Sequence, residues 1–471
     1  MSQKSEDQGA PAAGIPQRAP AQVTANKSTL LLGVSHEHQK YLEKIEWRLI
    51  EQLKPSSRNT RKHSRKQIKL LCEGYRKFGM MTPITIDISG EIICGHARYD
   101  AACQLSLKEV PVIVIRHLTE GSKRAYRIAD NKIGDLSSFD EKALALEIKS
   151  LIEIDTSFKA SDTGFDMVDV DLMIQSLEDV KIASSADDMP APHQLAISRR
   201  GERWVLGSHR LMCGDATNLD DCRALIADAQ IRQVVTDPPY GCKIDGHVSG
   251  LGKVKHREFV MGCDLSSTEL HDLFQTTFAN IAAVVCDGCL IFAFIDWRGL
   301  REMLNAGIAT FTELKNVITW RKVNAGMGSL YRSQTEFITL WKQGKAAHCN
   351  NVNLGVKRYR SNCWTYDGVN SLRAGRNEEL SSHPTPKPVQ MIADALLDCS
   401  ERGDAVLDLF AGGGSILIAA EKTGRCAYAM ELDPLYCDVA IRRWQKFTGQ
   451  TAVLENTGES FDEVTELRHD R

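Results

Sequence analysis

The stretch Val234-Val-Thr-Asp-Pro-Pro-Tyr240 is an apolar strand that two consecutive prolines interrupt. Proline has a fixed φ and no amide hydrogen, so a strand that reaches Pro238 and Pro239 must stop there. Asp237 and the carbonyl groups after it are left as acceptors at the carboxyl edge of a sheet, where open α/β sheets bind ligands. Such acceptors suit an exocyclic amino group, and Tyr240 offers an aromatic face for stacking a base. Taken alone, the stretch is equally compatible with a turn that has no function.

A second stretch, Val406-Leu-Asp-Leu-Phe-Ala-Gly-Gly-Gly-Ser415, is an apolar strand that ends in an acid and enters a glycine-rich turn before a helix. Glycine allows the backbone to approach a ligand closely. The spacing fits neither the dinucleotide fingerprint nor the Walker A motif. The next predicted strand, Ala427–Glu431, also ends in an acid, which is placed to accept the hydroxyls of a ribose. Together, the loop and this acid predict a nucleoside cofactor.

In combination, these motifs resemble the amino-group DNA methyltransferases that use S-adenosylmethionine, over about residues 200–447. The catalytic motif precedes the cofactor loop, as in the circularly permuted β group of that family. Leu409 and Gly413–Ser415 depart from the common pattern, which has proline and Ser-Gly-Thr there. The resemblance implies catalytic roles for Asp237, Pro238, Pro239 and Tyr240. It implies cofactor binding by Asp215, Thr385, Lys387, Asp408, Phe410, Ala411, Gly412, Gly414 and Glu431.

The mechanism that the resemblance implies starts with a base flipped out of double-stranded DNA. Tyr240 stacks on the base, while the Asp237 carboxylate and the Pro238 carbonyl accept its amino hydrogens. The amino nitrogen then attacks the methyl group in line. Within the family, Asp in this motif is associated with adenine-N6. Cytosine-N4 is the alternative target, and RNA or a protein glutamine is a less favoured one. An alternative function is that of a ParB-like regulatory protein with an inactive methylase domain.

The net charge of −3, from 58 Lys and Arg against 61 Asp and Glu, excludes a protein that coats nucleic acid through bulk charge. It hides a basic segment between Arg298 and Arg376, where 13 basic residues face 4 acidic ones. Basic residues interleaved with aromatic ones suit phosphate and base contacts, although a solvated surface is the alternative. We therefore expect DNA contacts here, from Arg321, Lys322, Arg332, Lys357, Arg358 and Arg360.

An N-terminal module contains the stretch Ile93-Cys-Gly-His-Ala-Arg-Tyr-Asp-Ala-Ala102, a strand, a glycine turn and an arginine that opens a helix. A helix N-terminus of this kind can bind an anion. Residues 46–135 resemble the ParB/sulfiredoxin-like domain, with a pocket formed by Gly95, His96 and Arg98. His96 and Ala97 replace the middle pair of the family's Gly-Glu-Arg-Arg. Docking of DNA or a protein partner, nucleotide binding and nuclease activity therefore remain open. A second basic patch, Lys54–Lys77, favours docking.

The fold class expected is α/β: a Rossmann-like methyltransferase sheet preceded by a small α+β ParB-like domain. The predicted divisions are a disordered leader (1–40), the ParB-like domain (41–135), a helical extension (136–180), a linker (181–199), the methyltransferase domain (200–447, with target recognition in about 241–380) and an acidic tail (448–471). No apolar run has the length of a membrane helix, and no signal peptide is recognised. We expect no metal, and a cytoplasmic protein that acts at a bacterial nucleoid or is encoded by a phage. A homodimer remains open.

Overall fold

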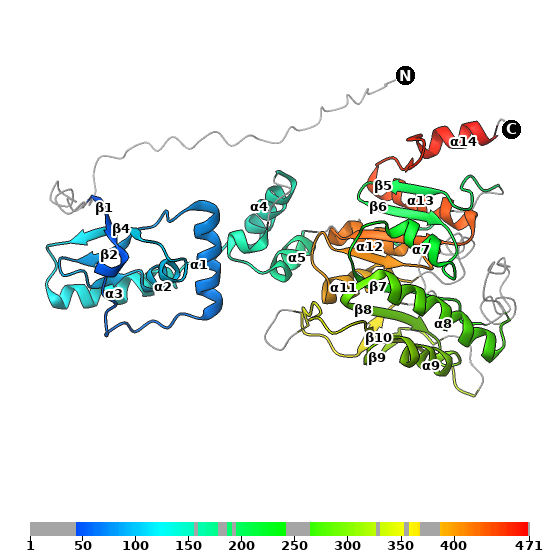
Figure 1. Cartoon of the computed structure of the whole chain (residues 1–471), viewed down its shortest axis with the longest axis horizontal. Helices are drawn as coiled ribbons and strands as arrows, with labels where there is room; N and C mark the ends of the chain where they lie inside the picture. Colours follow the sequence, from blue (N-terminus) through cyan, green and yellow to red (C-terminus); the bar gives the residue numbers. More distant parts are fainter. Residues whose placement is uncertain are drawn as a thin grey trace, which may run out of the picture. The chain divides into compact units, whose positions relative to one another are not determined.

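The computed structural model describes residues 44–154, 159–177, 186–190, 195–241, 264–325, 330–352, 358–367 and 387–469. The chain divides into two compact units, Met1–Ser137 and Ser138–Arg471 (Figure 1). The leader predicted at 1–40 lies outside the described residues, as do Lys357 and Thr385. No helix in the described ranges is long and apolar enough to cross a membrane.

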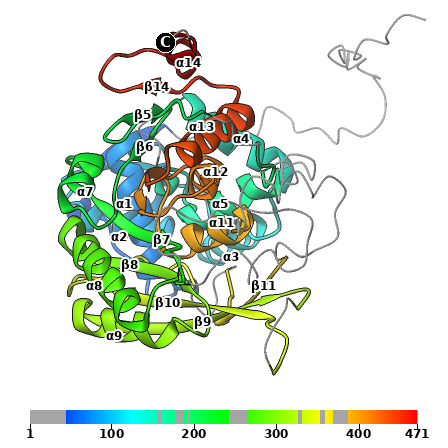
Figure 2. The same cartoon turned by 90° about the vertical axis from the view of Figure 1, so that its right-hand side faces the viewer.

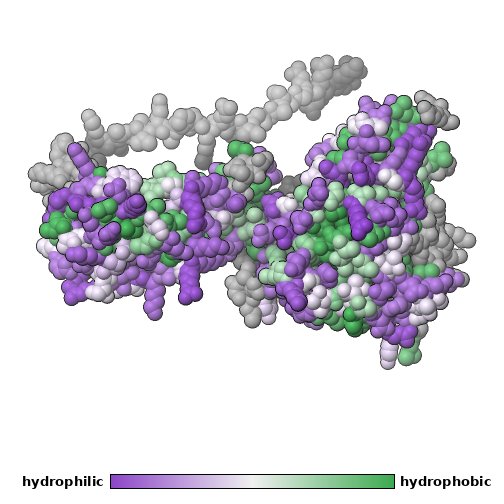
Figure 3. Space-filling model, in the orientation of Figure 1, coloured by the Kyte–Doolittle hydropathy of each residue, from purple (hydrophilic) through white to green (hydrophobic). Residues whose placement is uncertain are grey.

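The N-terminal unit is a small α+β domain around a four-stranded sheet with the order β1-β4-β2-β3. Strand β2 runs parallel to β4, while β1 and β3 are antiparallel to their neighbours. Alternate apolar residues such as Ile84 and Ile86 of β2 and Val112 of β4 form the core. Hydrophilic side chains cover much of the visible face of this unit (Figure 3). Its elements are β1 (Ile45–Leu49), α1 (Arg65–Phe78), β2 (Ile84–Asp87), β3 (Ile92–Cys94), α2 (His96–Gln104), β4 (Glu109–Ile115) and α3 (Glu120–Gly134).

The C-terminal unit is built on a ten-stranded sheet, counted in the described residues, with the order β11-β9-β10-β8-β7-β12-β13-β6-β5-β14. The central strands β8, β7, β12, β13 and β6 run parallel, so their carboxyl ends meet at one edge. The strands are β5 (Arg203–Leu206), β6 (His209–Cys213), β7 (Ile231–Thr236), β8 (Val285–Ile295), β9 (Glu313–Lys322), β10 (Thr335–Lys342), β11 (Cys363–Tyr366), β12 (Ala405–Asp408), β13 (Cys426–Glu431) and β14 (Val453–Leu454).

Helices cover both faces of this sheet, as Figure 2 shows, and each face has its own apolar core. One layer consists of α11 (Val389–Cys399), α12 (Ser415–Thr423) and α13 (Pro434–Thr448). The other consists of α7 (Leu219–Ile226), α8 (Ser267–Val284) and α9 (Leu300–Thr310). Helix α8 begins with a capping box between Ser266 and Glu269. Burial on both faces explains the nearly continuous apolar runs of the central strands.

The acidic segment predicted as a tail is folded onto the sheet. Strand β14 pairs antiparallel with β5, and α14 (Phe461–His469) follows it. Phe461 and Val464 are buried, while Asp462 and Glu463 between them are exposed. The acids therefore form the solvent face of an amphipathic helix, which is how a segment rich in charge can still pack.

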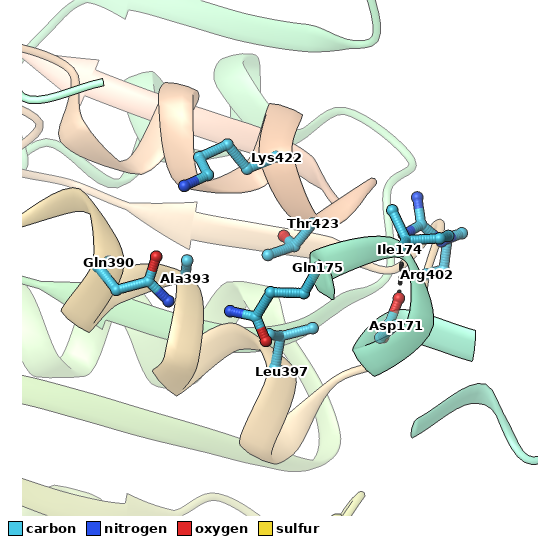
Figure 4. Close-up of a pocket in the computed structure, with 9 residues that line it drawn as sticks. All are labelled: Asp171, Ile174, Gln175, Gln390, Ala393, Leu397, Arg402, Lys422 and Thr423. Carbon is cyan, nitrogen blue, oxygen red and sulfur yellow. Dashed lines mark hydrogen bonds and ion pairs between the residues drawn. The ribbon is translucent and has the colours of Figure 1, made fainter. Parts of the chain in front are cut away.

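The helical extension comprises α4 (Glu141–Ile154) and α5 (Met167–Ser176), which belong to the C-terminal unit. Asp171 of α5 is buried and pairs with Arg402 at 3.0 Å and with Arg425 at 2.9 Å. The Arg425 side chain is fully buried. A small hollow of about 10 Å³ lies beside this pair, between α5, α11 and α12 (Figure 4). A buried charge network, together with apolar packing, thus holds the extension on the ten-stranded sheet.

We expect Asp171→Ala to lower the free energy of unfolding of the C-terminal unit by about 3–5 kcal/mol, because it leaves a buried guanidinium without its carboxylate. Urea denaturation followed by circular dichroism measures the effect. Asp220→Ala is the matched control: Asp220 is 89% exposed and pairs with Arg223 at 3.6 Å on the surface. A surface pair contributes about 1 kcal/mol or less. Equal effects of the two substitutions would contradict the role given to Asp171.

Candidate functional site

Four acidic residues gather at the carboxyl edge of the parallel strands. Asp215 follows β6, Glu431 ends β13, Asp408 ends β12 and Asp237 follows β7. The strands are neighbours in the sheet, and the Gly214 amide donates to the Glu431 carbonyl at 3.0 Å. Residues from four strand ends, two within residues 215–237 and two within residues 408–431, therefore form one site, at the edge where the sequence predicts ligand binding.

The glycine-rich loop after β12 is shaped to admit a ligand. Gly412 and Gly414 have φ of 51° and 74°, which favour glycine. A Cβ on Gly414 would lie 2.8 Å from the Ala440 Cβ atom. The Glu431 carboxylate accepts hydrogen bonds from the Gly412 and Asp433 amides, each at 2.8 Å. Gly414 is thus required for packing against α13, while the Glu431 carboxylate beside the turn fits a nucleoside with a ribose diol.

Two carboxyl groups near this loop, Glu431 and Asp408, have raised pKa values and so hold a proton more strongly than usual. Burial raises the pKa of Glu431 to about 7, against the pull of backbone amides that donate to it. Burial also raises the pKa of Asp408 to about 7. Asp408 accepts from the Thr236 hydroxyl at 2.8 Å and from the Phe410 amide at 3.0 Å. Hydrogen-bond donors supplied by a ligand would favour the charged forms.

The catalytic motif places Tyr240 and Asp237 in direct contact. The Tyr240 hydroxyl donates to Asp237 Oδ1 at 2.8 Å, and the ring packs against both cores of the unit. Burial raises the pKa of Tyr240 well above its ordinary value, so the phenol stays a donor. Burial also raises the pKa of Asp237, while the Lys387 ammonium pulls it down. Asp237 is thus a partly exposed acceptor, 24% accessible, at the end of β7.

Lys387 contacts both halves of the site. Its carbonyl accepts from Ser415 Oγ at the start of α12, next to the glycine-rich loop. Its ammonium lies 2.7 Å from Asp237 Oδ2 and 3.5 Å from Glu336 Oε2. The role of Lys387 in cofactor binding stays a prediction, because the structure shows its side chain on the catalytic carboxylate.

Glu336 of β10 is a site residue that sequence reasoning missed. It accepts from the Tyr240 hydroxyl at 3.2 Å and pairs with Lys322 and Lys387. Burial raises the pKa of Glu336, but the charges of Lys387 and Lys322 outweigh it and hold this pKa below the ordinary value. One signal was present: Glu336 is one of 4 acids in the basic segment 298–376, and it lies in an apolar strand.

The residues predicted to contact DNA fall into different surroundings. Arg321 and Arg332 are exposed, as a phosphate contact requires. Arg358 is instead buried and ion-paired with Asp394 at 3.1 Å and Asp398 at 3.0 Å, and its contact with DNA stays a prediction. Arg360 pairs with the same two carboxylates, and Lys322 pairs with Glu336 beside Tyr240. These three side chains hold the recognition segment to its own unit.

In the N-terminal unit, Gly95 caps α2 with a φ of 102°, and the next two predicted residues are held by the backbone. His96 Nε2 accepts from the Ser56 amide at 3.3 Å, and burial lowers the pKa of His96, so the imidazole is neutral. Arg98 donates to the Pro83 carbonyl at 3.1 Å. Among the described residues, no cluster of three His, Cys, Asp or Glu side chains could hold a metal ion.

Comparison with known proteins gives each unit a family. The model of the DNA methylase family matches residues 231–442, and the ParB N-terminal domain matches residues 35–132. Members of the DNA methylase family use S-adenosylmethionine, which fits the acceptors and close approach around Glu431.

Individual relatives divide in the same way. The ParB-like nuclease domain-containing protein YnaK of Escherichia coli is 43% identical over 81 residues, which are 17% of this chain and 93% of that protein. The type II methyltransferase M2.DpnII of Streptococcus pneumoniae is 25% identical over 224 residues, 45% of this chain and 81% of that protein. The solved structure of the PvuII DNA methyltransferase (cytosine-N4-specific) covers 60% of this chain and 95% of its own, with 14% identity and a TM-score of 0.41. The chain therefore belongs to two families at once, with a ParB N-terminal domain followed by a DNA methylase domain of the N6/N4 amino-methyltransferase family.

Proposed function

We propose that this protein transfers a methyl group from S-adenosylmethionine to the N6 amino group of adenine in double-stranded DNA. The observation that carries the proposal is the position of Asp237. Asp237 directly follows β7, which pairs with β12, the strand that leads into the glycine-rich loop. The hydrogen bond from Thr236 to Asp408 joins the ends of these two strands. An amino group bound at Asp237 therefore lies beside any ligand of the glycine-rich loop.

The residues of the chain supply position and electrostatics. The cofactor, when bound, supplies an electrophilic methyl group. Glu431 accepts the ribose hydroxyls, and the backbone of Gly412 and Gly414 lies close to the ligand. Tyr240 stacks on the flipped base, while Asp237 and the Pro238 carbonyl accept the two amino hydrogens and leave the nitrogen lone pair directed at the methyl group. Positioning of this kind can contribute about 7–11 kcal/mol.

The attack leaves the amino nitrogen with a surplus proton. With a base bound, the Asp237 carboxylate would accept a hydrogen bond from this nitrogen. It would take the proton as the bond from nitrogen to the methyl carbon forms and the methyl–sulfur bond breaks, which leaves a neutral thioether as the leaving group. Burial, which raises the pKa of Asp237, makes this carboxylate a better base than an exposed one. The proton then passes to solvent, since Asp237 is partly exposed.

Adenine is preferred to cytosine because the motif starts with Asp, an association within the family. Cytosine-N4 is the second candidate, and it uses the same acceptors. The ParB-like domain, with its basic helix α1, is proposed to dock the enzyme on DNA or on a protein partner, with a nucleotide as the alternative ligand. A homodimer is compatible with these assignments.

Sequencing of modified bases in DNA from an expression host tests the base and the recognition site in one experiment. We expect N6-methyladenine at one short sequence in cells that express the protein. Cells that express Asp237→Ala serve as the control. N4-methylcytosine would select the second candidate, and unmodified DNA would reject the methyltransferase function.

Asp237→Ala is expected to abolish methyl transfer, because the amino group loses its acceptor in a buried site. Transfer of tritiated methyl groups to host DNA measures activity, and calorimetric binding of S-adenosylmethionine controls for folding. Asp237→Asn keeps one acceptor oxygen and is expected to retain part of the activity. Full activity of the alanine variant would rule out the assignment of Asp237.

Binding of S-adenosylmethionine should weaken as the pH falls from about 8 to about 5.5. The ligand hydroxyls need the charged form of Glu431, whose pKa burial raises to about 7. Each group of this kind can weaken binding by about tenfold per pH unit below its pKa. Calorimetry across this range measures the dissociation constant. Glu431→Gln should bind more weakly at high pH and depend less on pH. A dissociation constant of the wild type that does not change with pH would contradict the role of Glu431.

A further inference from the structure

Four charged side chains form one cluster around the catalytic tyrosine. Two are carboxylates, Asp237 after β7 and Glu336 on β10, and two are ammonium groups, Lys387 before α11 and Lys322 on β9. Lys387 bridges the carboxylates, at 2.7 Å from Asp237 and 3.5 Å from Glu336, and Lys322 pairs with Glu336. The four formal charges cancel, which is what a buried ionic cluster requires.

The site is also built to keep the Lys387 ammonium charged. Its side chain is only 6% exposed. The nitrogen lies 5.2 Å from the centre of the Tyr240 ring, 5.5 Å from that of Phe294 and 5.9 Å from that of Trp320. Aromatic faces at these distances attract a cation, most strongly where water is excluded. Burial alone lowers the pKa of Lys387, but Asp237 and Glu336 reverse this and raise it.

Asp237 and Glu336 compete for this single ammonium. A carboxylate that is paired with Lys387 alone would stay charged but would be a weak acceptor for an amino group and a weak base. Without Lys387, the same partly exposed carboxylate would take up a proton at a higher pH and become a weaker acceptor. Glu336 also accepts from the Tyr240 hydroxyl, so it holds the stacking ring and the ammonium from the same side.

We propose that Glu336 is a positioning residue of the methyl-transfer site: Lys387 keeps Asp237 charged, and Glu336 draws this ammonium partly away from Asp237, so that the carboxylate stays able to accept the amino hydrogens of the target base. The inference rests on the proposed function, and it assigns the Lys387 side chain to the catalytic carboxylate. Glu336 touches neither the base nor the cofactor in this arrangement. It sets how strongly Lys387 is drawn towards Asp237.

Several groups face Asp237 from the elements packed around it, and the direction of each effect follows from its charge. Burial, Glu336 on β10 and Asp408 on β12 oppose the charged form of Asp237, whereas Lys387 before α11 and the hydrogen bond from Tyr240 after β7 favour it. Lys322 on β9 acts on Glu336, and Asp296 after β8 acts on Tyr240. Removal of Lys387 should therefore raise the pKa of Asp237, and removal of the Glu336 charge should lower it.

The test compares Lys387→Met, Glu336→Gln and the double variant in the full chain, with the exposed Lys345→Met as the matched control. The rate of methyl transfer to DNA is measured against pH. In the plot of kcat against pH, we expect the fall in rate on the acid side (the acid limb) to move to higher pH in Lys387→Met and to lower pH in Glu336→Gln. In the double variant it should return towards the wild-type position. At its best pH, Glu336→Gln should be about 10- to 100-fold slower, the effect of losing one charge-assisted hydrogen bond. Lys345→Met should match the wild type.

Two further measurements separate the alternatives. Glu336→Asp keeps the charge and should keep the wild-type acid limb, which a purely structural role would not predict. Calorimetry of S-adenosylmethionine should give similar dissociation constants for all variants. Loss of binding in Lys387→Met would assign this lysine to the cofactor site and overturn the proposal. Acid limbs that do not move, or that move in the same direction for both single variants, would also overturn it.

A readout without catalysis keeps this inference distinct from the proposed function. A wild type that binds S-adenosylmethionine but never methylates DNA would reject the function alone. The apparent Tm of the two single variants and of the double variant then shows whether Glu336 and Lys387 are energetically coupled. Non-additive shifts support coupling between Glu336 and Lys387, whereas additive shifts would exclude it.

Discussion

The site depends on one buried hydrogen bond, from the Thr236 hydroxyl to Asp408 Oδ1 at 2.8 Å. It joins the last residue of β7 to the last residue of β12, which are 172 positions apart in the chain. The strands also pair in parallel, so their carboxyl ends are level. The catalytic motif and the cofactor loop can therefore serve the same reaction although a long insertion separates them. The order of the motifs along the chain matters little, because the sheet determines which strand ends are neighbours.

The same edge of the sheet concentrates negative charge that the unit must tolerate. At Asp408 and Glu431, burial raises the pKa values to about 7, which reduces the negative charge, and both carboxyl groups accept hydrogen bonds from backbone amides. At Asp237, the ammonium of Lys387 offsets this charge. The difference follows the chemistry that each group serves. Under the proposed function, a cofactor brings its own donors to Glu431, whereas Asp237 must stay an acceptor before a base has arrived.

Much of this arrangement could be predicted from the sequence, since strands that end in Asp-Pro-Pro-Tyr and in Asp408 are local patterns with a physical meaning. The central strands β7, β12 and β13 lie where their apolar runs predict. Partnerships across the chain could not be predicted. Nothing local distinguishes Arg358, which is buried against Asp394, from Arg321, which is exposed. Glu336 was missed for the same reason. Its proposed role depends on its ion pair with Lys387, and only the tertiary fold brings the two residues together.

The stretch predicted as a linker lies, in its described part, within the C-terminal unit. The stretch around residues 181–199, rich in small residues and proline, reads as a linker between domains, yet its described part packs on the methylase unit. The Ala186 carbonyl accepts from Arg443, and the Asp187 carboxylate accepts from the Val389 amide at the start of α11. Arg443 also donates to the Gly413 carbonyl of the cofactor loop at 2.8 Å. The division of the chain falls earlier, between Ser137 and Ser138. The helical extension and the stretch after it are therefore structural parts of the methylase unit, and they support the loop that the cofactor needs.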